Sequence, residues 1–169
     1  MEKKRKSNPN KVKGSFAERY YAKVFRALGF PFCETSRFAS QKHDNAKVDL
    51  VYIPFNIQIK AGIQQNLNPG KELFMMKSSI NAMFPAEEDI HKRPCLLIHY
   101  KQGTQGVIRT PDMEMIYMSI IQFDIFKNKN PNLEYQTLKD FKFDLQSEFK
   151  TIVGMTFEYF KNEVILKQK

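Results

Sequence analysis

Three residues in one short segment have side chains that could take part in phosphodiester hydrolysis: Asp49, Gln58 and Lys60. Gln58 and Lys60 are two positions apart in a period-two pattern, so both side chains point to the same face of a predicted strand. Oxygen ligands hold a hard cation such as Mg²⁺, and a nearby ammonium can orient water or offset developing charge. The segment predicts a site with Asp49 as the main metal ligand, Gln58 as a neutral oxygen ligand and Lys60 as the cation. An ordinary half-exposed hairpin with polar side chains facing water is an open alternative.

The elements that would position these residues can be read from their periodicity. Two period-two segments, 48–53 and 56–60, predict a β-hairpin with the acid on its first strand. Apolar residues at helical spacing predict a preceding helix over 16–28. Ser15 is the predicted N-cap of that helix, and Glu18 would complete a capping box. Glu18 could have no role beyond capping, or it could also face the metal site.

The rest of the chain predicts further alternation of helices and strands. Residues 33–47 are polar and turn-rich, which favours a strand start followed by a mobile loop. The later segments predict a helix over 73–84, strands over 94–100 and 107–109, an element at 113–126 that is either strand or helix, and a C-terminal helix over 145–166 weakened by Gly154. This order indicates an α/β fold with a mixed sheet.

Length and charge bound the organisation and the partner. The 169 residues suit one domain, predicted at 14–169 after a basic, mobile tail at 1–13. The net charge is +9, and the first 13 residues hold six basic residues and one acidic residue. A basic tail can attract the phosphates of nucleic acid, or it can be only a solubilising end.

Other composition signals exclude several classes. No stretch approaches the roughly 20 apolar residues of a membrane span, and no apolar segment follows the basic tail as in a secretory signal. The two cysteines lack CxxC spacing, which favours reduced thiols in a cytoplasmic protein. His43, His91 and His99 lack the spacing of zinc ligands. The abundance of Lys, Asn, Ile and Phe would suit a virus-encoded protein acting in a host cytoplasm.

A series of motifs covering roughly residues 11–100 carries a family resemblance. In chain order they are Lys13-Gly14-Ser15, Ala17-Glu18-Arg19, Leu28-Gly29-Phe30, Arg37, Ser40, Val48-Asp49-Leu50-Val51, Gln58-Ile59-Lys60 and Arg93-Pro94-Cys95-Leu96-Leu97-Ile98. Together they resemble the PD-(D/E)xK nuclease superfamily and, within it, the archaeal-type Holliday junction resolvases. The resemblance implies a restriction-endonuclease-like core, with a mixed β-sheet flanked by helices.

The resemblance also implies roles for single residues. Glu18, Asp49 and Gln58 would be metal ligands for Mg²⁺ or Mn²⁺, and Lys60 would complete the catalytic set. Gln58 departs from the usual carboxylate, although Mrr-like members of the superfamily use QxK. The resemblance also gives a loop serine, Ser40, with Ser36 as the alternative. The basic residues that cluster around the proposed site could contact DNA phosphates, or each could be solvated surface: Lys13, Arg19, Arg37, Lys42 and Lys47.

The function implied is a structure-selective DNA endonuclease that acts in recombination and repair. It would be a homodimer that cleaves branched DNA such as a four-way junction by metal-dependent hydrolysis. Two alternatives stay open. One is an Mrr-like or repair nuclease on the same fold, and the other is a catalytically silent nucleic-acid-binding module.

Overall fold

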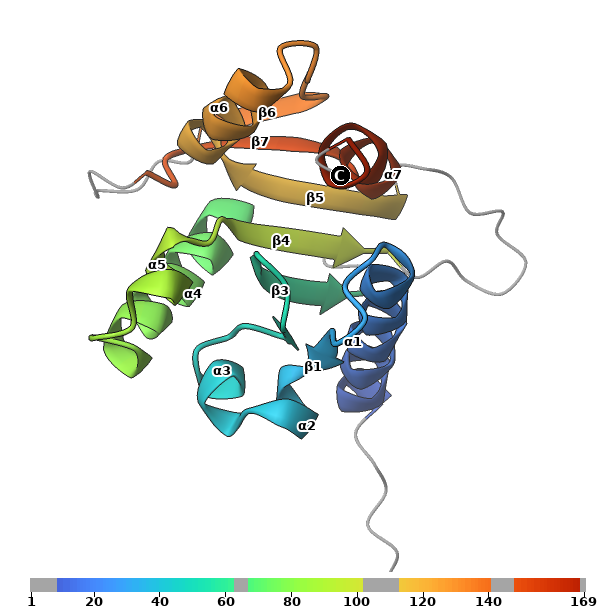
Figure 1. Cartoon of the computed structure of the whole chain (residues 1–169), viewed down its shortest axis with the longest axis vertical. Coiled ribbons are helices and arrows are strands. Elements are labelled where there is room, and N and C mark those ends of the chain that lie inside the picture. The colour runs from blue at the N-terminus through green and yellow to red at the C-terminus, as the bar shows by residue number, and fades with distance from the viewer. Residues whose placement is uncertain (1–8, 63–66, 102–112, 141–147, 168–169) are drawn as a thin grey trace, which may run out of the picture.

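A five-stranded mixed sheet forms the centre of the protein and lies between two layers of helices (Figure 1). The computed structural model describes residues 9–62, 67–101, 113–140 and 148–167. The strand order across the sheet is β3 (Asn56–Ala61), β4 (Cys95–Tyr100), β5 (Glu114–Ser119), β7 (Thr151–Thr156) and β6 (Thr137–Asp140). β3 and β4 are parallel, and the other neighbours are antiparallel. The prediction of an α/β fold with a mixed sheet flanked by helices is confirmed.

One face of the sheet is covered by the connection between β3 and β4. This connection contains α4 (Pro69–Met83) and α5 (Glu88–Lys92). The side chain of Asn68 accepts a hydrogen bond from the backbone N–H of Lys71 and so caps α4. Buried apolar residues of α4 then pack against alternate residues of the strands, among them Leu73, Met76, Ile80, Cys95 and Leu97. The predicted helix at 73–84 and the predicted strand at 94–100 are confirmed.

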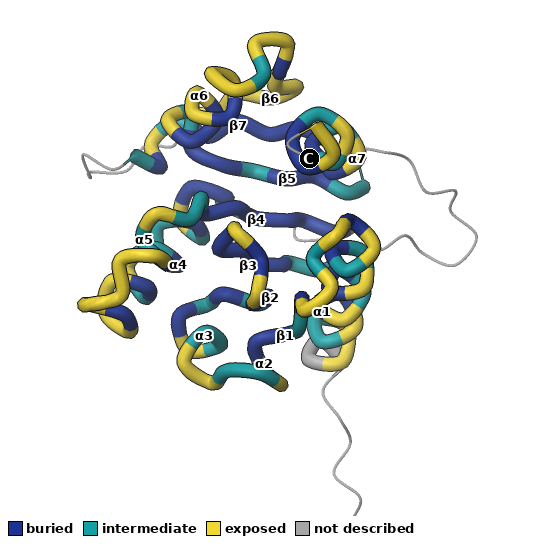
Figure 2. The backbone as a smooth tube through the Cα atoms, viewed as in Figure 1, coloured by how far each residue is buried: buried dark blue, intermediate teal, exposed yellow. Residues whose placement is uncertain are grey.

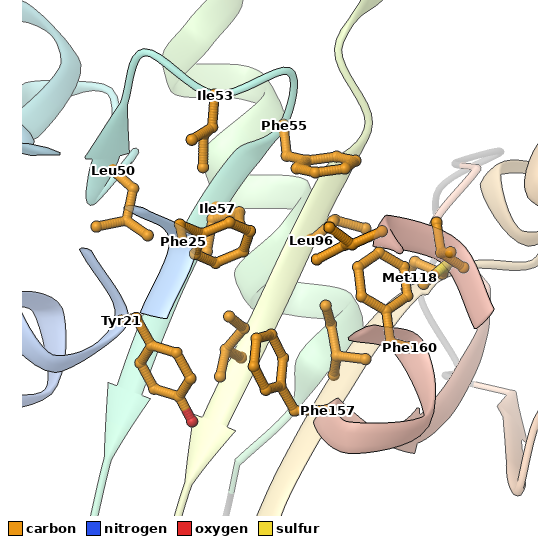
Figure 3. Close-up of a cluster of buried hydrophobic side chains, with 14 of the residues drawn as sticks. Tyr21, Phe25, Leu50, Ile53, Phe55, Ile57, Leu96, Met118, Phe157 and Phe160 are labelled. Carbon is orange, nitrogen blue, oxygen red and sulfur yellow. The ribbon is translucent and has the colours of Figure 1, made fainter. Parts of the chain in front are cut away.

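The opposite face is covered by α1 (Pro9–Ala27), α6 (Ile120–Lys129), α7 (Phe157–Phe160) and the π-helix η2 (Lys161–Ile165). Tyr21 and Phe25 of α1 are fully buried there, and Figure 3 shows them beside Ile57 of β3 and Phe157 of α7. The ring centroids of Phe25 and Phe157 are 6.0 Å apart. Aromatic packing therefore holds the N-terminal helix against the C-terminal one.

The first helix begins earlier than its sequence pattern predicts. Pro9 suits the first turn of a helix because it has no backbone N–H to satisfy, and α1 continues through Gly14. Ser15 and Glu18 therefore lie inside α1, and the predicted capping box is wrong. Residues 9–13, which the sequence placed in the tail, are helical, while residues 1–8 lie outside the described ranges.

A small lobe precedes the sheet. It consists of β1 (Glu34–Thr35), α2 (Ser36–Ala39), α3 (Gln41–Asn45) and β2 (Leu50–Val51). The predicted mobile loop at 33–47 is therefore largely a pair of short helices. The predicted hairpin of 48–53 with 56–60 is wrong in its pairing, because β2 forms an antiparallel ladder with β1 instead of β3. Left-handed backbone at Lys47 and Tyr52, both at φ 62°, confines the extended segment to a few residues.

The C-terminal segment is the largest departure from the sequence pattern. Residues 151–156 form β7, which pairs with β5 on one side and β6 on the other, so the predicted helix over 145–166 is wrong for these residues. Its second half is confirmed as helical, because α7 and η2 cover residues 157–165. Gly154 lies in this strand against Tyr117 and Thr137, where it leaves room for both side chains. The element at 113–126 divides into β5 and the first part of α6. The predicted strand at 107–109 lies outside the described residues.

The burial of each strand depends on whether helices cover it. The strands β3, β4 and β7 are buried along most of their length, whereas β6 at the sheet edge is exposed throughout (Figure 2). In the part of the chain that the structure describes, we find no helix with the length and apolar character that crossing a membrane requires.

Candidate functional site

Asp49 is held at the edge of β3 by two hydrogen bonds, one made by its backbone N–H and one accepted by its side chain. Its backbone N–H donates to the carbonyl of Ile57 at 2.7 Å, and its Oδ2 accepts from the backbone N–H of Ile59 at 2.6 Å. The carbonyl of Asp49 accepts from the N–H of Ser36 at 2.9 Å. The two bonds to β3 flank Gln58, so the carboxylate is held beside the strand that carries the other two predicted site residues.

The surroundings of Asp49 shift the protonation of its carboxyl group. Burial raises its pKa to about 7, against the lowering effect of the bond from Ile59. The charge of Glu18 raises it further, while the charges of Lys60 and Arg37 lower it. Lys60, Arg37 and Glu18 are therefore close enough to Asp49 for their charges to shift its pKa. A carboxyl group with this pKa is partly protonated at neutral pH, and a bound cation would favour its ionised form.

Gln58 is buried on the face of β3 that α4 covers. Ile57 and Ile59 pack into the core on the α1 side, so the predicted alternation of side chains along β3 is confirmed. Only 5% of Gln58 is exposed, and no donor in the described residues reaches its Oε1. A buried acceptor without a donor is costly unless water or a cation satisfies it. Its oxygen is therefore available as a ligand.

Lys60 forms an ion pair with Glu72, a residue that sequence reasoning missed. The Nζ of Lys60 lies 3.1 Å from Oε2 of Glu72, and both side chains are about three-quarters buried. Glu72 is in the first turn of α4, where the helix dipole favours an acid. Its place opposite Lys60 depends on the packing of α4 over β3, which the local sequence does not encode.

Glu18 is joined to the lobe by Arg37. Glu18 is 4% exposed, and its Oε1 lies 3.0 Å from the Nη2 of Arg37, whose Nε lies 3.7 Å from Asp44. Burial raises the pKa of Glu18, Arg37 lowers it, and Asp44 raises it. Arg37 was predicted to contact DNA. It neutralises a buried acid while part of its own side chain remains exposed.

The oxygen donors at this site fit a hard cation, though with few charges. Across the described ranges, no three residues among His, Cys, Asp and Glu form a group that could hold a metal. Asp49 nevertheless offers a desolvated carboxylate and Gln58 an amide oxygen without a donor. Both are ligands of the kind that Mg²⁺ and Mn²⁺ take. Glu18 is engaged by Arg37, so Asp49 and Gln58 would be the principal protein ligands.

The two candidate serines differ in their surroundings. The Oγ of Ser40 accepts from the backbone N–H of His43 at 3.4 Å and lies 2.8 Å from the Nδ1 of that residue. Ser40 therefore caps α3. Ser36 is fully buried, and its N–H bonds to Asp49. Of the two, Ser36 is the one in direct contact with Asp49.

The predicted DNA-contacting lysines and arginine on other elements are in mixed settings. Lys13 and Arg19 are exposed on α1. The Nζ of Lys42 lies 2.6 Å from Glu87 and 4.3 Å from the centroid of the Phe84 ring, so its charge already has partners. Lys47 is half-buried in its left-handed turn. Of these four residues, Lys13 and Arg19 are the ones most open to phosphate.

Comparisons with known proteins give no relative to this chain. No family model, no curated protein and no solved structure matches it.

Proposed function

We propose that this protein is a metal-dependent DNA endonuclease that hydrolyses branched DNA, with a four-way junction as the preferred substrate. The observation that carries the proposal is the bond from the N–H of Ile59 to the carboxylate of Asp49. That bond holds an acid beside a strand whose adjacent residues, Gln58 and Lys60, point to a common face. The three side chains combine two oxygen ligands with an ammonium.

Each of these residues would have its own role in the proposed reaction. Asp49 and Gln58 would hold Mg²⁺ or Mn²⁺, and the ion, when bound, supplies a Lewis acid and a more acidic water. Lys60 would offset charge that develops on the phosphoryl oxygens. Glu18, anchored by Arg37, adds negative potential at Asp49, which the charge of a cation would relieve.

The fold and charge are compatible with this activity. A mixed sheet with helices on both faces supports the proposed restriction-endonuclease-like core, with α1 and α4 on opposite faces of β3. The chain carries a net charge of +9, which favours association with DNA. Symmetric cleavage of a four-way junction needs two active sites, so the proposed enzyme acts as a homodimer.

Two observations favour the second candidate function, a silent nucleic-acid-binding module. Lys60 is paired with Glu72, and Glu18 is paired with Arg37, so two of the four predicted catalytic residues already have partners of opposite charge. Gln58 also brings no charge to a metal. The same glutamine would suit an Mrr-like nuclease that cleaves ordinary duplex.

A cleavage assay with matched substrates separates these readings. The full chain is incubated with a synthetic four-way junction and with a linear duplex of the same sequence, each with Mg²⁺, with Mn²⁺ or with EDTA. Symmetric nicking of the junction alone, dependent on the metal, is the expected result. Equal cleavage of both substrates would favour the general nuclease. Tight binding without cleavage in either metal would favour the silent module.

A further inference from the structure

The outward side of α1 combines exposed apolar residues with basic ones. Val12 and Phe16 are one helical turn apart and are 50% and 53% exposed. Lys13, Arg19 and Lys23 are exposed on the same helix. We call these five residues the α1 outer face. From Val12 to Lys23 it extends about 17 Å at the rise of an α-helix.

The cations of the α1 outer face have no ion-pair partner among the described residues. No carboxylate there forms an ion pair with Lys13, Arg19 or Lys23, whereas three ion pairs elsewhere join residues three or four positions apart. The single acid in α1 is Glu18, which is buried and paired with Arg37. Phe16 is therefore an exposed ring among three cations that form no ion pair with an acid in the described part of the chain.

These charges limit what can cover the surface. In a twofold dimer the same patch would meet itself and bring six cations together, which like-charge repulsion opposes. An anionic partner is favoured instead. An acidic polypeptide would use the cations but not the ring, whereas a nucleic acid strand offers phosphates to the cations and a base face to Phe16.

The exposed ring of Phe16 also favours binding to single strands over binding to duplex. In a continuous duplex the faces of the bases are stacked on one another, so an exposed phenyl ring has no base face to contact. An unpaired strand presents its bases, and stacking on an aromatic side chain is then favourable. Arg19 directly follows Glu18 in α1, so one residue of the α1 outer face is a chain neighbour of a predicted site residue.

We propose that the α1 outer face binds an unpaired strand of nucleic acid, with phosphates at Lys13, Arg19 and Lys23 and a base stacked on Phe16. As an account of substrate choice, this rests on the proposed nuclease function. Among branched substrates, it predicts tighter binding to those that carry an unpaired arm or flap beside the branch. Single-strand binding itself does not depend on cleavage.

Fluorescence anisotropy in EDTA tests the proposal without cleavage. The probes are a labelled 20-nucleotide oligo(dT), an abasic strand of the same length and a blunt hairpin duplex. Phe16→Ala should weaken binding to oligo(dT) by about 5- to 100-fold and change binding to the other two probes less than about twofold. Phe16→Leu should lose nearly as much, because it keeps an apolar side chain but not the ring. Phe16→Tyr should restore binding.

Matched controls lie on α6. Ile121 is 51% exposed, so Ile121→Ala removes a comparable apolar surface elsewhere and should bind like the unmodified protein. Lys23→Gln should reduce the salt slope for oligo(dT) by about 0.7, and Lys129→Gln should not. All of these positions are on helix surfaces, and melting curves check that each variant folds.

The outcomes separate this inference from the proposed function. Equal oligo(dT) binding by Phe16→Ala, Phe16→Leu and the unmodified protein would overturn the inference, even if the junction is cleaved. Competition by polyglutamate as effective as that by oligo(dT) would overturn it in favour of an acidic protein partner. A ring-dependent preference for oligo(dT) in a protein that cleaves no DNA would uphold the inference and refute the nuclease.

Discussion

One carboxylate oxygen of Asp49 lies 2.6 Å from the backbone nitrogen of Ile59, the residue between Gln58 and Lys60. This bond gives the acid a fixed position at the edge of β3 without using either of the two polar side chains. The bond itself lowers the pKa of Asp49, but burial of the carboxyl group raises it more, to about 7. The position of the acid and its protonation state are therefore set by different interactions.

Substitutions at Gln58 should change the metal dependence of cleavage in opposite directions. Gln58→Glu adds a charge to the ligand set and should lower the Mg²⁺ concentration for half-maximal cleavage. Gln58→Leu removes the oxygen and should nearly abolish cleavage, yet it should not lower the melting temperature because the oxygen has no donor. A Mg²⁺ titration of junction cleavage measures both. If Gln58→Leu titrates like the unmodified protein, Gln58 is not a ligand.

The raised pKa of Asp49 predicts a pH dependence of stability. Since its folded-state pKa of about 7 lies above the ordinary 3.8, the folded state binds more protons between these values. The stability that this group contributes is therefore present at low pH and is lost as pH rises towards 7. In EDTA, Asp49→Asn should be more stable than the unmodified protein at pH 8, by about 1–3 kcal/mol, and similar near pH 4. Urea unfolding across this range checks the sign, and equal stability at pH 8 would contradict the shift.

Gly154 provides a test of the C-terminal strand. A Cβ at this position would lie 2.5 Å from Oγ1 of Thr137 and 2.7 Å from a ring carbon of Tyr117. Gly154→Ala should therefore destabilise the protein by about 1–3 kcal/mol. If residues 145–166 were a helix, the same change would stabilise it by up to about 1 kcal/mol. The sign of the change in unfolding free energy decides between strand and helix.

Lys47 ends α3 in a left-handed conformation. Its φ is 62°, and the N–H groups of Lys47 and Val48 bond back to carbonyls of Asp44 and His43. Glycine adopts this conformation without steric cost. Lys47→Gly should thus raise the unfolding free energy by about 0.5–1 kcal/mol, and thermal melting monitored by circular dichroism will measure it. A loss of stability would mean that the lysine side chain has a structural role.

The spacing of apolar residues along the sequence predicted the elements that depend on short-range periodicity. The alternation of β3, the apolar face of α4 and the buried strand β4 follow from side-chain spacing alone. The start of α1 was missed because Ser15 and Glu18 form a convincing capping box within a longer helix. The C-terminal strand was missed because Phe149, Ile152, Val153, Phe157 and Phe160 have helical spacing. Pairing with β5 and β6 overrides it, and sequence spacing does not show strand pairing.

Some residues of the candidate site could likewise be predicted from the sequence, and others could not. Asp49, Gln58 and Lys60 could be proposed from residue type and spacing within one segment. Glu72 could not, because it reaches Lys60 only through the crossover that lays α4 over the sheet. Arg37 was identified as basic and near the site, but its pairing with a buried Glu18 depends on how the lobe docks on α1.

The most direct test of the central proposal is a comparison of cleavage and binding for Asp49→Asn. Asparagine can still accept the bond from Ile59, so the lobe should stay in place while the main metal ligand loses its charge. We expect the unmodified protein to nick a four-way junction in Mg²⁺, and Asp49→Asn to bind it within about threefold but to cleave at least about 100-fold more slowly. Undiminished cleavage by Asp49→Asn would contradict the proposed site.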